Sequence, residues 1–188
     1  MSKYKKELGK EMRFHMFLQY KFNEKWVKLR FFCQQNDIKL IGDVPIYIAL
    51  DSSDTWSSPE NFQLDKDGFP KAVAGVPPDA FNADQLWGNP LYYWDKMKKV
   101  GFKWWIMRLK ATSEKFVTIR IVHFRGLEAY WSVPYGDKTA RNGKWIKGPD
   151  NDFIKANLQQ MIKSLVEYII DQIEIKDLSK LLFYPFLL

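Results

Sequence analysis

Phe116-Val117-Thr118-Ile119-Arg120-Ile121-Val122 is a run dominated by β-branched residues, and it continues into His123-Phe124-Arg125-Gly126. β-Branched side chains favour extended backbone, so the run predicts a β-strand that ends near His123. Helix-like stretches precede it, from Leu91 to Val100 and from Phe102 to Lys115, with a break at Gly101. The fold is therefore expected to place a helix directly before this strand.

A second helix followed by a strand lies earlier in the chain. From about Lys6 to Gln35, apolar residues recur at steps of three and four, which predicts a long amphipathic helix. The members of this apolar face are Phe14, Phe17, Leu18, Phe22, Trp26, Leu29 and Cys33. Ile38 to Ile48 then predicts a strand that delivers Asp43 near its end. Successive helix and strand pairs indicate parallel β/α units, so we expect an α/β fold.

Turn-forming residues dominate the other segments. Residues 51–90 contain many Ser, Pro, Gly and Asp, which predicts a long irregular segment of the kind that forms binding loops. Residues 131–149 are also predicted to be irregular, and a helix is expected from about Asp152 to Tyr168. The period of residues 169–188 is ambiguous between helix and strand.

The size and charge of the chain limit its class. A length of 188 residues with 46% hydrophobic residues predicts one globular domain or part of a larger one. The net charge of +7 raises nucleic acid as a partner. The basic residues are dispersed, however, and no nucleic-acid-binding module encloses them. We therefore expect no nucleic-acid partner.

Cysteine usage and the termini indicate a cytoplasmic protein. Cys33 is the only cysteine, which excludes an intrachain disulfide, and no Cys and His cluster has the spacing of a zinc site. The N-terminal residues lack the apolar core of a signal peptide, and no stretch approaches the roughly 20 apolar residues of a membrane span. We expect no metal, no cofactor and no membrane association. The apolar residues 181–188 suggest a core that is cut short.

Three segments carry a longer pattern. In chain order they are residues 41–47 with 51–56 and 62–68, then 74–81 with 85–92, and finally 120–131 with 142–149. They contain the motifs Ile41-Gly42-Asp43-Val44-Pro45-Ile46-Tyr47, Ala74-Gly75-Val76-Pro77-Pro78-Asp79 and Arg120-Ile121-Val122-His123-Phe124-Arg125-Gly126. Over about residues 11–155 the chain resembles an amylomaltase, which is a 4-α-glucanotransferase of the α-amylase clan.

The resemblance implies an incomplete (β/α)8 TIM barrel, because a whole barrel usually needs about 250 residues. It implies one partial catalytic-barrel domain over residues 1–188, in which 51–90 form a loop-rich substrate-cleft segment and 156–188 a divergent tail. Sites in this fold collect at the C-terminal ends of the strands. The site is therefore expected where the two predicted strands end.

The resemblance also implies a reaction. Amylomaltases transfer α-1,4-linked glucan segments between maltooligosaccharides by a retaining double displacement. One carboxylate attacks the anomeric carbon, and a carboxylic acid about 5 to 5.5 Å away assists the leaving group. α-1,4-Glucans and maltooligosaccharides are thus the expected partners.

Substrate-binding roles carry over to residues that match the family's motifs. Arg120 would hydrogen-bond the sugar and the nucleophile, because a forked guanidinium serves a carboxylate and hydroxyl groups at once. His123 would contact sugar at the strand end, and Asp43 would support the sugar or Arg120.

The loop from Asp79 to Pro90 resembles the family's mobile loop over the cleft. Phe81 and Trp87 would cover sugar faces, and Asp79 and Gln85 would meet hydroxyl groups. The family has a Tyr where Ala80 stands and a Gly before the Gln, so the loop is predicted to be one residue short.

The catalytic carboxylates are missing from the pattern. Val122 stands where the family has Asp in Arg-Ile-Asp-His-Phe-Arg-Gly. The family's acid lies within Ile-Ile-Ala-Glu-Asp-Leu-Gly, and two alignments place Gln172 or Lys176 at its position. No catalytic residue is therefore expected to be intact, and we expect the chain alone to be inactive.

An alternative function is a non-catalytic glucan-binding or interaction protein that kept the cleft of this family. A partial barrel leaves sheet edges unpaired and apolar faces uncovered. This alternative therefore requires a partner chain that supplies the missing barrel strands.

Overall fold

The computed structural model describes residues 2–80 and 84–159. Its helices and strands, in chain order, are α1 (Ser2–Glu7), α2 (Gly9–Gln35), β1 (Ile41–Pro45), α3 (Ser53–Ser57), η1 (Pro59–Asn61), β2 (Ala72–Val76), β3 (Gln85–Pro90), α4 (Trp94–Lys99), α5 (Lys103–Ser113), β4 (Thr118–Val122), η2 (Phe124–Leu127), β5 (Ala129–Pro134), η3 (Ala140–Asn142) and β6 (Lys144–Lys147). Residues 150–159 are helical as well.

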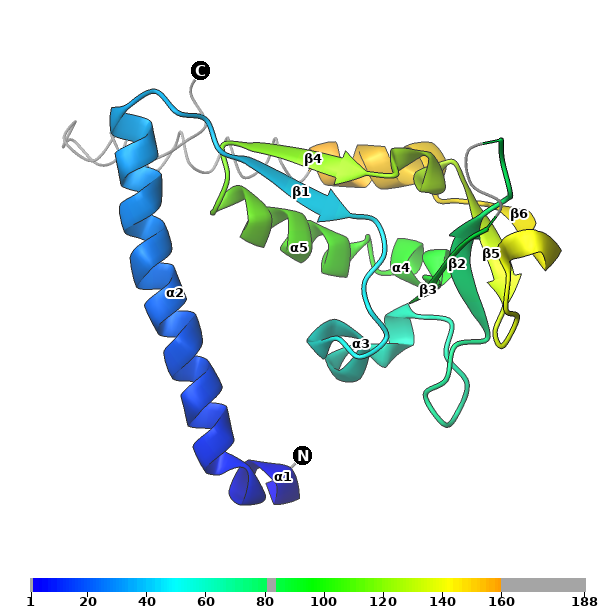
Figure 1. The fold of residues 1–188 in the computed structure, drawn as a ribbon, viewed down its shortest axis with the longest axis horizontal. Coiled ribbons are helices and arrows are strands. Elements are labelled where there is room, and N and C mark those ends of the chain that lie inside the picture. The colour runs from blue at the N-terminus through cyan, green and yellow to red at the C-terminus, as the bar shows by residue number, and fades with distance from the viewer. Residues whose placement is uncertain (1, 81–83, 160–188) are drawn as a thin grey trace.

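Strands β1 and β4 pair in parallel, as the repeated helix and strand order predicted. The register sets Asp43 opposite Arg120 and Pro45 opposite Val122. Helix α5 packs along these two strands and contacts both of them (Figure 1). Gly42 and Val44 are buried, whereas Ile41, Asp43 and Pro45 are exposed. One face of the pair therefore meets the helix, and the other face is open in the described part of the chain.

A second sheet has the strand order β3-β2-β5-β6 and is antiparallel throughout. Figure 1 shows it beyond the C-terminal ends of β1 and β4. Irregular structure was predicted for most of the residues in this sheet, and that prediction is wrong. Its strands are short and interrupted by Gly75, Gly88 and Pro90, so their own sequences carry no clear period. Pairing with distant strands determines their structure instead.

Aromatic side chains dominate the core that joins the two sheets. Tyr92, Trp105 and Phe62 are almost fully buried, and Phe153 from the helix at 150–159 closes the cluster. The rings of Trp105 and Phe153 lie 5.3 Å apart in an edge-to-face arrangement, which is a favourable geometry for aromatic pairs. Part of the aromatic content of the sequence is thus used for packing, whereas other aromatic side chains, such as those of Phe14 and Phe17, are exposed.

The predicted break between two helices at Gly101 is confirmed. Gly101 has a φ of 65° and Phe102 a φ of 53°, so two successive residues adopt the left-handed region. Glycine tolerates this region without steric cost, whereas Phe102 does not. Burial of the Phe102 ring in the core offsets the unfavourable backbone there.

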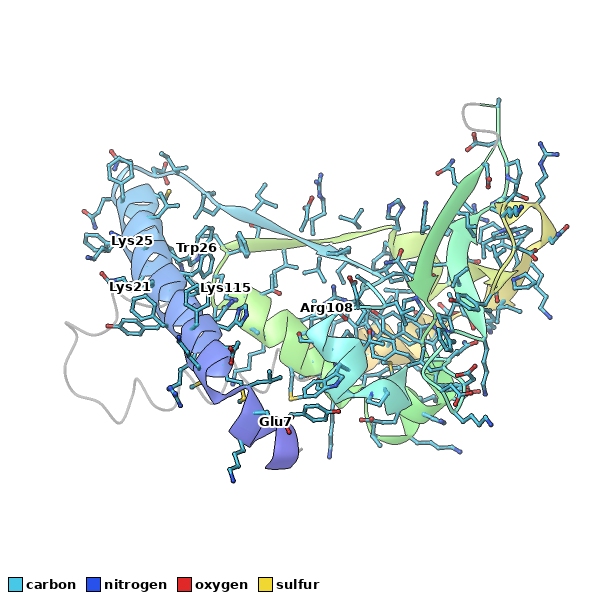
Figure 2. All side chains as sticks on the ribbon, turned by 60° about the horizontal axis from the view of Figure 1, so that its bottom comes forward. Glu7, Lys21, Lys25, Trp26, Arg108 and Lys115 are labelled. Atoms are coloured by element: carbon cyan, nitrogen blue, oxygen red, sulfur yellow. The ribbon has the colours of Figure 1, made fainter. Side chains whose placement is uncertain are left out.

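The long N-terminal helix is present, but most of its predicted apolar face is not covered within the described residues. Phe14, Phe17 and Phe22 remain about half exposed, and only Cys33 of that face is buried. Trp26 makes the principal contact, since its indole N–H donates to the Lys115 carbonyl at 3.1 Å (Figure 2). Figure 1 shows the rest of α2 extending away from the sheets.

Residues 2–80 and 84–159 form an α/β structure in which no closed barrel is present. Part of the predicted helix from Asp152 to Tyr168 lies outside these residues, as does most of the tail at 156–188. None of the helices in the described ranges is long and apolar enough to cross a membrane.

Candidate functional site

An ion pair joins the exposed face of β1 to that of β4. Nε of Arg120 donates to Oδ1 of Asp43 at 2.8 Å, and Nη2 donates to Oδ2 at 2.6 Å. Hydrogen bonding to Arg120 holds the pKa of Asp43 below its ordinary value. Because that carboxylate is paired in a bidentate geometry and stays ionised, it is poorly suited to donate a proton.

Val122 lies two residues after Arg120 on the same strand, so both side chains leave β4 on the same side. The side chain of Val122 is partly buried. An isopropyl group has no lone pair and cannot attack an anomeric carbon. The structure therefore presents the guanidinium of the predicted site beside a position that carries no nucleophile.

A buried donor, Tyr92, and a partly exposed donor, Arg108, hold the C-terminal end of β1. The hydroxyl of Tyr92 donates to the Ile46 carbonyl at 2.6 Å, and Nη2 of Arg108 donates to the Pro45 carbonyl at 2.8 Å. Figure 2 shows Arg108 on α5, on the side of the helix that faces β1. Burial raises the pKa of Tyr92, so its hydroxyl remains a donor. These bonds fix the chain just beyond Asp43.

Aromatic rings cluster where β4 ends. His123 has a φ of 57°, and its ring centroid lies 4.6 Å from that of Trp87 on β3. The ring centroid of Tyr47, which follows β1, lies 6.1 Å from that of Trp87. A Cβ atom at Gly126 would come within 2.9 Å of the Ile46 side chain, so the absence of a side chain there permits this close packing. Rings from three separate segments thus meet at one end of the parallel pair.

The loop between β2 and β3 holds two further predicted residues together. Nε2 of Gln85 lies 3.4 Å from Oδ2 of Asp79, which is a long hydrogen bond. Asp84 anchors the same loop, because its Oδ1 accepts a hydrogen bond from the Ala140 backbone N–H at 2.7 Å. Phe81 lies outside the described residues.

The structure thus brings the predicted residues together in pairs. Asp43 meets Arg120, His123 meets Trp87, and Asp79 meets Gln85. Gln172 and Lys176, the two alternatives for the acid position, lie outside the described residues.

Sequence reasoning missed three residues that support this site. Arg108 and Tyr92 hold the end of β1, and Asp84 anchors the loop. The sequence gives little indication of these roles, since Arg108 occupies a helix and Tyr92 comes two residues after β3. Their partners are distant in the chain, so local patterns do not reveal them.

The arrangement is suited to binding a neutral, hydroxyl-rich ligand. Exposed donors and acceptors lie on one side, and aromatic faces lie at the strand ends. Within residues 2–80 and 84–159, no group of three or more His, Cys, Asp or Glu side chains has a geometry that could hold a metal ion.

Comparison with known proteins gives consistent results. A family model described as 4-alpha-glucanotransferase matches residues 1–173. The chain is 52% identical over 152 residues to a 4-alpha-glucanotransferase of Clostridium butyricum, a match that covers 80% of this chain and 31% of that relative. The 4-alpha-glucanotransferase of Aquifex aeolicus is 47% identical over 152 residues, with the same coverage of 80% and 31%. The chain therefore spans about a third of the length of these curated relatives.

Solved structures agree with these matches. An amylomaltase from Streptococcus agalactiae in complex with acarbose has a TM-score of 0.82 at 37% identity and covers 85% of this chain and 32% of its own. The crystal structure of amylomaltase from Corynebacterium glutamicum has a TM-score of 0.67 at 20% identity, covers 77% of this chain and 20% of its own, and shares the fold.

Proposed function

We infer the function from one premise, which is that the chain belongs to the 4-alpha-glucanotransferase family. We propose that it forms part of an incomplete (β/α)8 barrel and contributes the Asp43 and Arg120 side of a cleft for α-1,4-glucans. The observation that carries this proposal is the bidentate contact between Arg120 and Asp43 on the open face of β1 and β4.

The reaction of the family would be the transfer of α-1,4-glucan segments between maltooligosaccharides by retaining double displacement. That reaction forms a bond between a carboxylate oxygen and the anomeric carbon while the leaving oxygen takes a proton from a carboxylic acid. Val122 supplies no oxygen for the first bond. We therefore propose that this chain binds glucans and does not catalyse transfer by itself.

The proposed substrate contacts follow the pairs in the site. Arg120 and Asp43 would meet sugar hydroxyl groups, and Trp87 with His123 would cover an apolar sugar face, because flat rings suit such faces. Asp79, Gln85 and Phe81 would act from the loop at one border of the cleft.

The domain and partner proposals extend this function. We propose one partial catalytic-barrel domain over residues 1–188, a substrate-cleft segment at 51–90 and a divergent tail at 156–188. The outer edges of the two-stranded β1–β4 sheet, which pair with no other strand in the described residues, support a partner chain that supplies further barrel strands. A cytoplasmic location fits the single Cys33.

Isothermal titration calorimetry with maltoheptaose tests the glucan-binding proposal. Arg120→Ala is expected to weaken binding by roughly tenfold, because removal of a charged hydrogen-bonding partner costs on the order of 1.5 kcal/mol. Arg141→Ala is the matched control, since Arg141 is an exposed arginine outside the site. Equal affinities of the two variants would contradict the proposed cleft.

A further inference from the structure

We propose that a groove between α3 and the turn at residues 64–70 is a second α-glucan-binding subsite, with Trp56 as its stacking platform. This inference rests on the proposed glucan specificity, but the groove shares no residue with the Asp43 and Arg120 site. The cavity has a volume of about 580 Å³ and is lined in part by Asp51, Ser53, Trp56, Leu64 and Gly68.

Trp56 is unusual in its exposure. Its side chain is 71% exposed, although tryptophan is highly buried on average in folded proteins. It makes no ring contact with any other aromatic side chain among residues 2–80 and 84–159. An indole that is largely exposed and stacks on no other ring in this part of the chain is available to stack on a flat apolar surface, such as a glucose ring.

The backbone that carries the Trp56 side chain is held by hydrogen bonds. Oγ of Ser52 caps α3 by accepting a hydrogen bond from the Thr55 backbone N–H at 3.3 Å. The buried Thr55 hydroxyl donates to the Ala49 carbonyl at 3.0 Å. Trp56 follows directly, so its backbone is fixed before any ligand arrives. A fixed backbone at this position reduces the entropy lost on binding.

The opposite wall of the groove is a closed turn. Oδ1 of Asp65 accepts hydrogen bonds from the backbone N–H groups of Asp67 and Phe69, each at 2.9 Å. Gly68 has a φ of 88°, which the turn requires and which glycine readily adopts. Both walls of the groove are therefore ordered by their own hydrogen bonds.

The polar groups of the groove favour a ligand with hydroxyl groups over an anionic one. Within the described ranges, no hydrogen bond from another protein group occupies the Asp51 carboxylate or the Ser53 hydroxyl, and both residues are exposed. A carboxylate repels anionic ligands and accepts hydrogen bonds from sugar hydroxyls. Beside an exposed indole, this chemistry fits a maltooligosaccharide better than a phosphate or an acidic peptide.

Fluorine NMR of the full chain labelled with 5-fluorotryptophan tests the subsite residue by residue. The chain has eight tryptophans, which single Trp→Phe substitutions assign. Titration with maltoheptaose is expected to shift the Trp56 resonance in a saturable way. An unchanged Trp56 resonance overturns the subsite, whatever the others do. The Trp87 resonance reports separately on the cleft proposed above, so the two ideas fail independently.

Two substitutions complete the test. Trp56→Ala is expected to weaken maltoheptaose binding at the subsite by roughly tenfold, as truncation of a central aromatic contact does in other interfaces. Tyr20→Ala is the matched control, because Tyr20 is 65% exposed on α2. Equal loss of binding in both variants, or a Trp56 shift equally strong with cellohexaose, overturns an α-glucan subsite.

Discussion

At the scale of single residues, the site combines a retained guanidinium with a missing nucleophile. Arg120 keeps a bidentate partner in Asp43, so its fork is already oriented for hydrogen bonding. Val122 is next on the same face of β4 and offers only methyl groups. Binding and bond cleavage are therefore separable properties in this chain.

Restoring a carboxylate at Val122 is not expected to restore transfer. Val122→Asp supplies one of the two carboxyl groups of the retaining reaction. The position of the second is occupied by Gln172 or Lys176, and neither side chain is a carboxylic acid. Glucose release from maltotriose should stay at the level of a heat-treated sample for wild type and variant alike. Release above that level by either protein would contradict the inactive state that we propose.

The Asp43 pair predicts a defined response to acid. The pKa of Asp43 is lowered by hydrogen bonding to Arg120, so the carboxylate form is favoured in the folded chain. The resulting stabilisation is complete above the ordinary Asp range and is lost as the pH falls through the lowered pKa. A pH titration followed by carbon NMR of the Asp43 carboxyl group measures this effect. The titration midpoint of Asp43 should rise in Arg120→Gln and stay unchanged in Arg141→Gln. An unchanged midpoint in Arg120→Gln would refute the pairing.

At the scale of elements, β1 depends on close contact with the segment that precedes β4. A Cβ atom at Gly42 would overlap the ring of Phe116, so Gly42 permits the approach of that ring. The buried side of β1 and the site on its other face are thus positioned by the same strand. Steric crowding on the buried face of β1 should therefore disturb the ion pair of Asp43 and Arg120 on its exposed face.

Gly42→Ala tests this dependence. The substitution is expected to lower the free energy of unfolding by about 2 kcal/mol, as overpacking of a core does. Gly9→Ala is the control, because a Cβ atom there meets only the flexible Arg13 side chain at 3.5 Å. Urea unfolding followed by circular dichroism measures both, and equal stabilities would show that Phe116 moves aside without cost.

At the scale of the whole molecule, the contacts of α2 with the other described elements lie mainly in its C-terminal half. Trp26 bonds to the Lys115 carbonyl, and its ring lies 5.3 Å from that of Phe116. Arg30 also donates to the Glu114 carbonyl. The aromatic residues earlier in the helix remain exposed in the described structure.

Trp26→Ala and Phe14→Ala are therefore expected to differ in effect. The first should cost about 2 kcal/mol of stability through lost packing and a lost hydrogen bond. The second should cost less than about 0.5 kcal/mol, since Phe14 is 58% exposed. Comparison of their urea midpoints checks this, and a large loss in Phe14→Ala would mean that α2 is covered along its whole length.

The amino-acid sequence by itself determined the elements that depend on local patterns. The strands ending near Asp43 and Val122, the helix break at Gly101 and the parallel order follow from propensity and periodicity, which act over a few residues. The tertiary structure alone decided the antiparallel sheet, the exposure of α2 and Trp56, and the bonds of Tyr92 and Arg108 to the end of β1. The physical reason is that strand pairing and buried hydrogen bonds depend on contacts between segments far apart in the chain, such as the bond between Tyr92 and Ile46. Local sequence patterns do not contain this information.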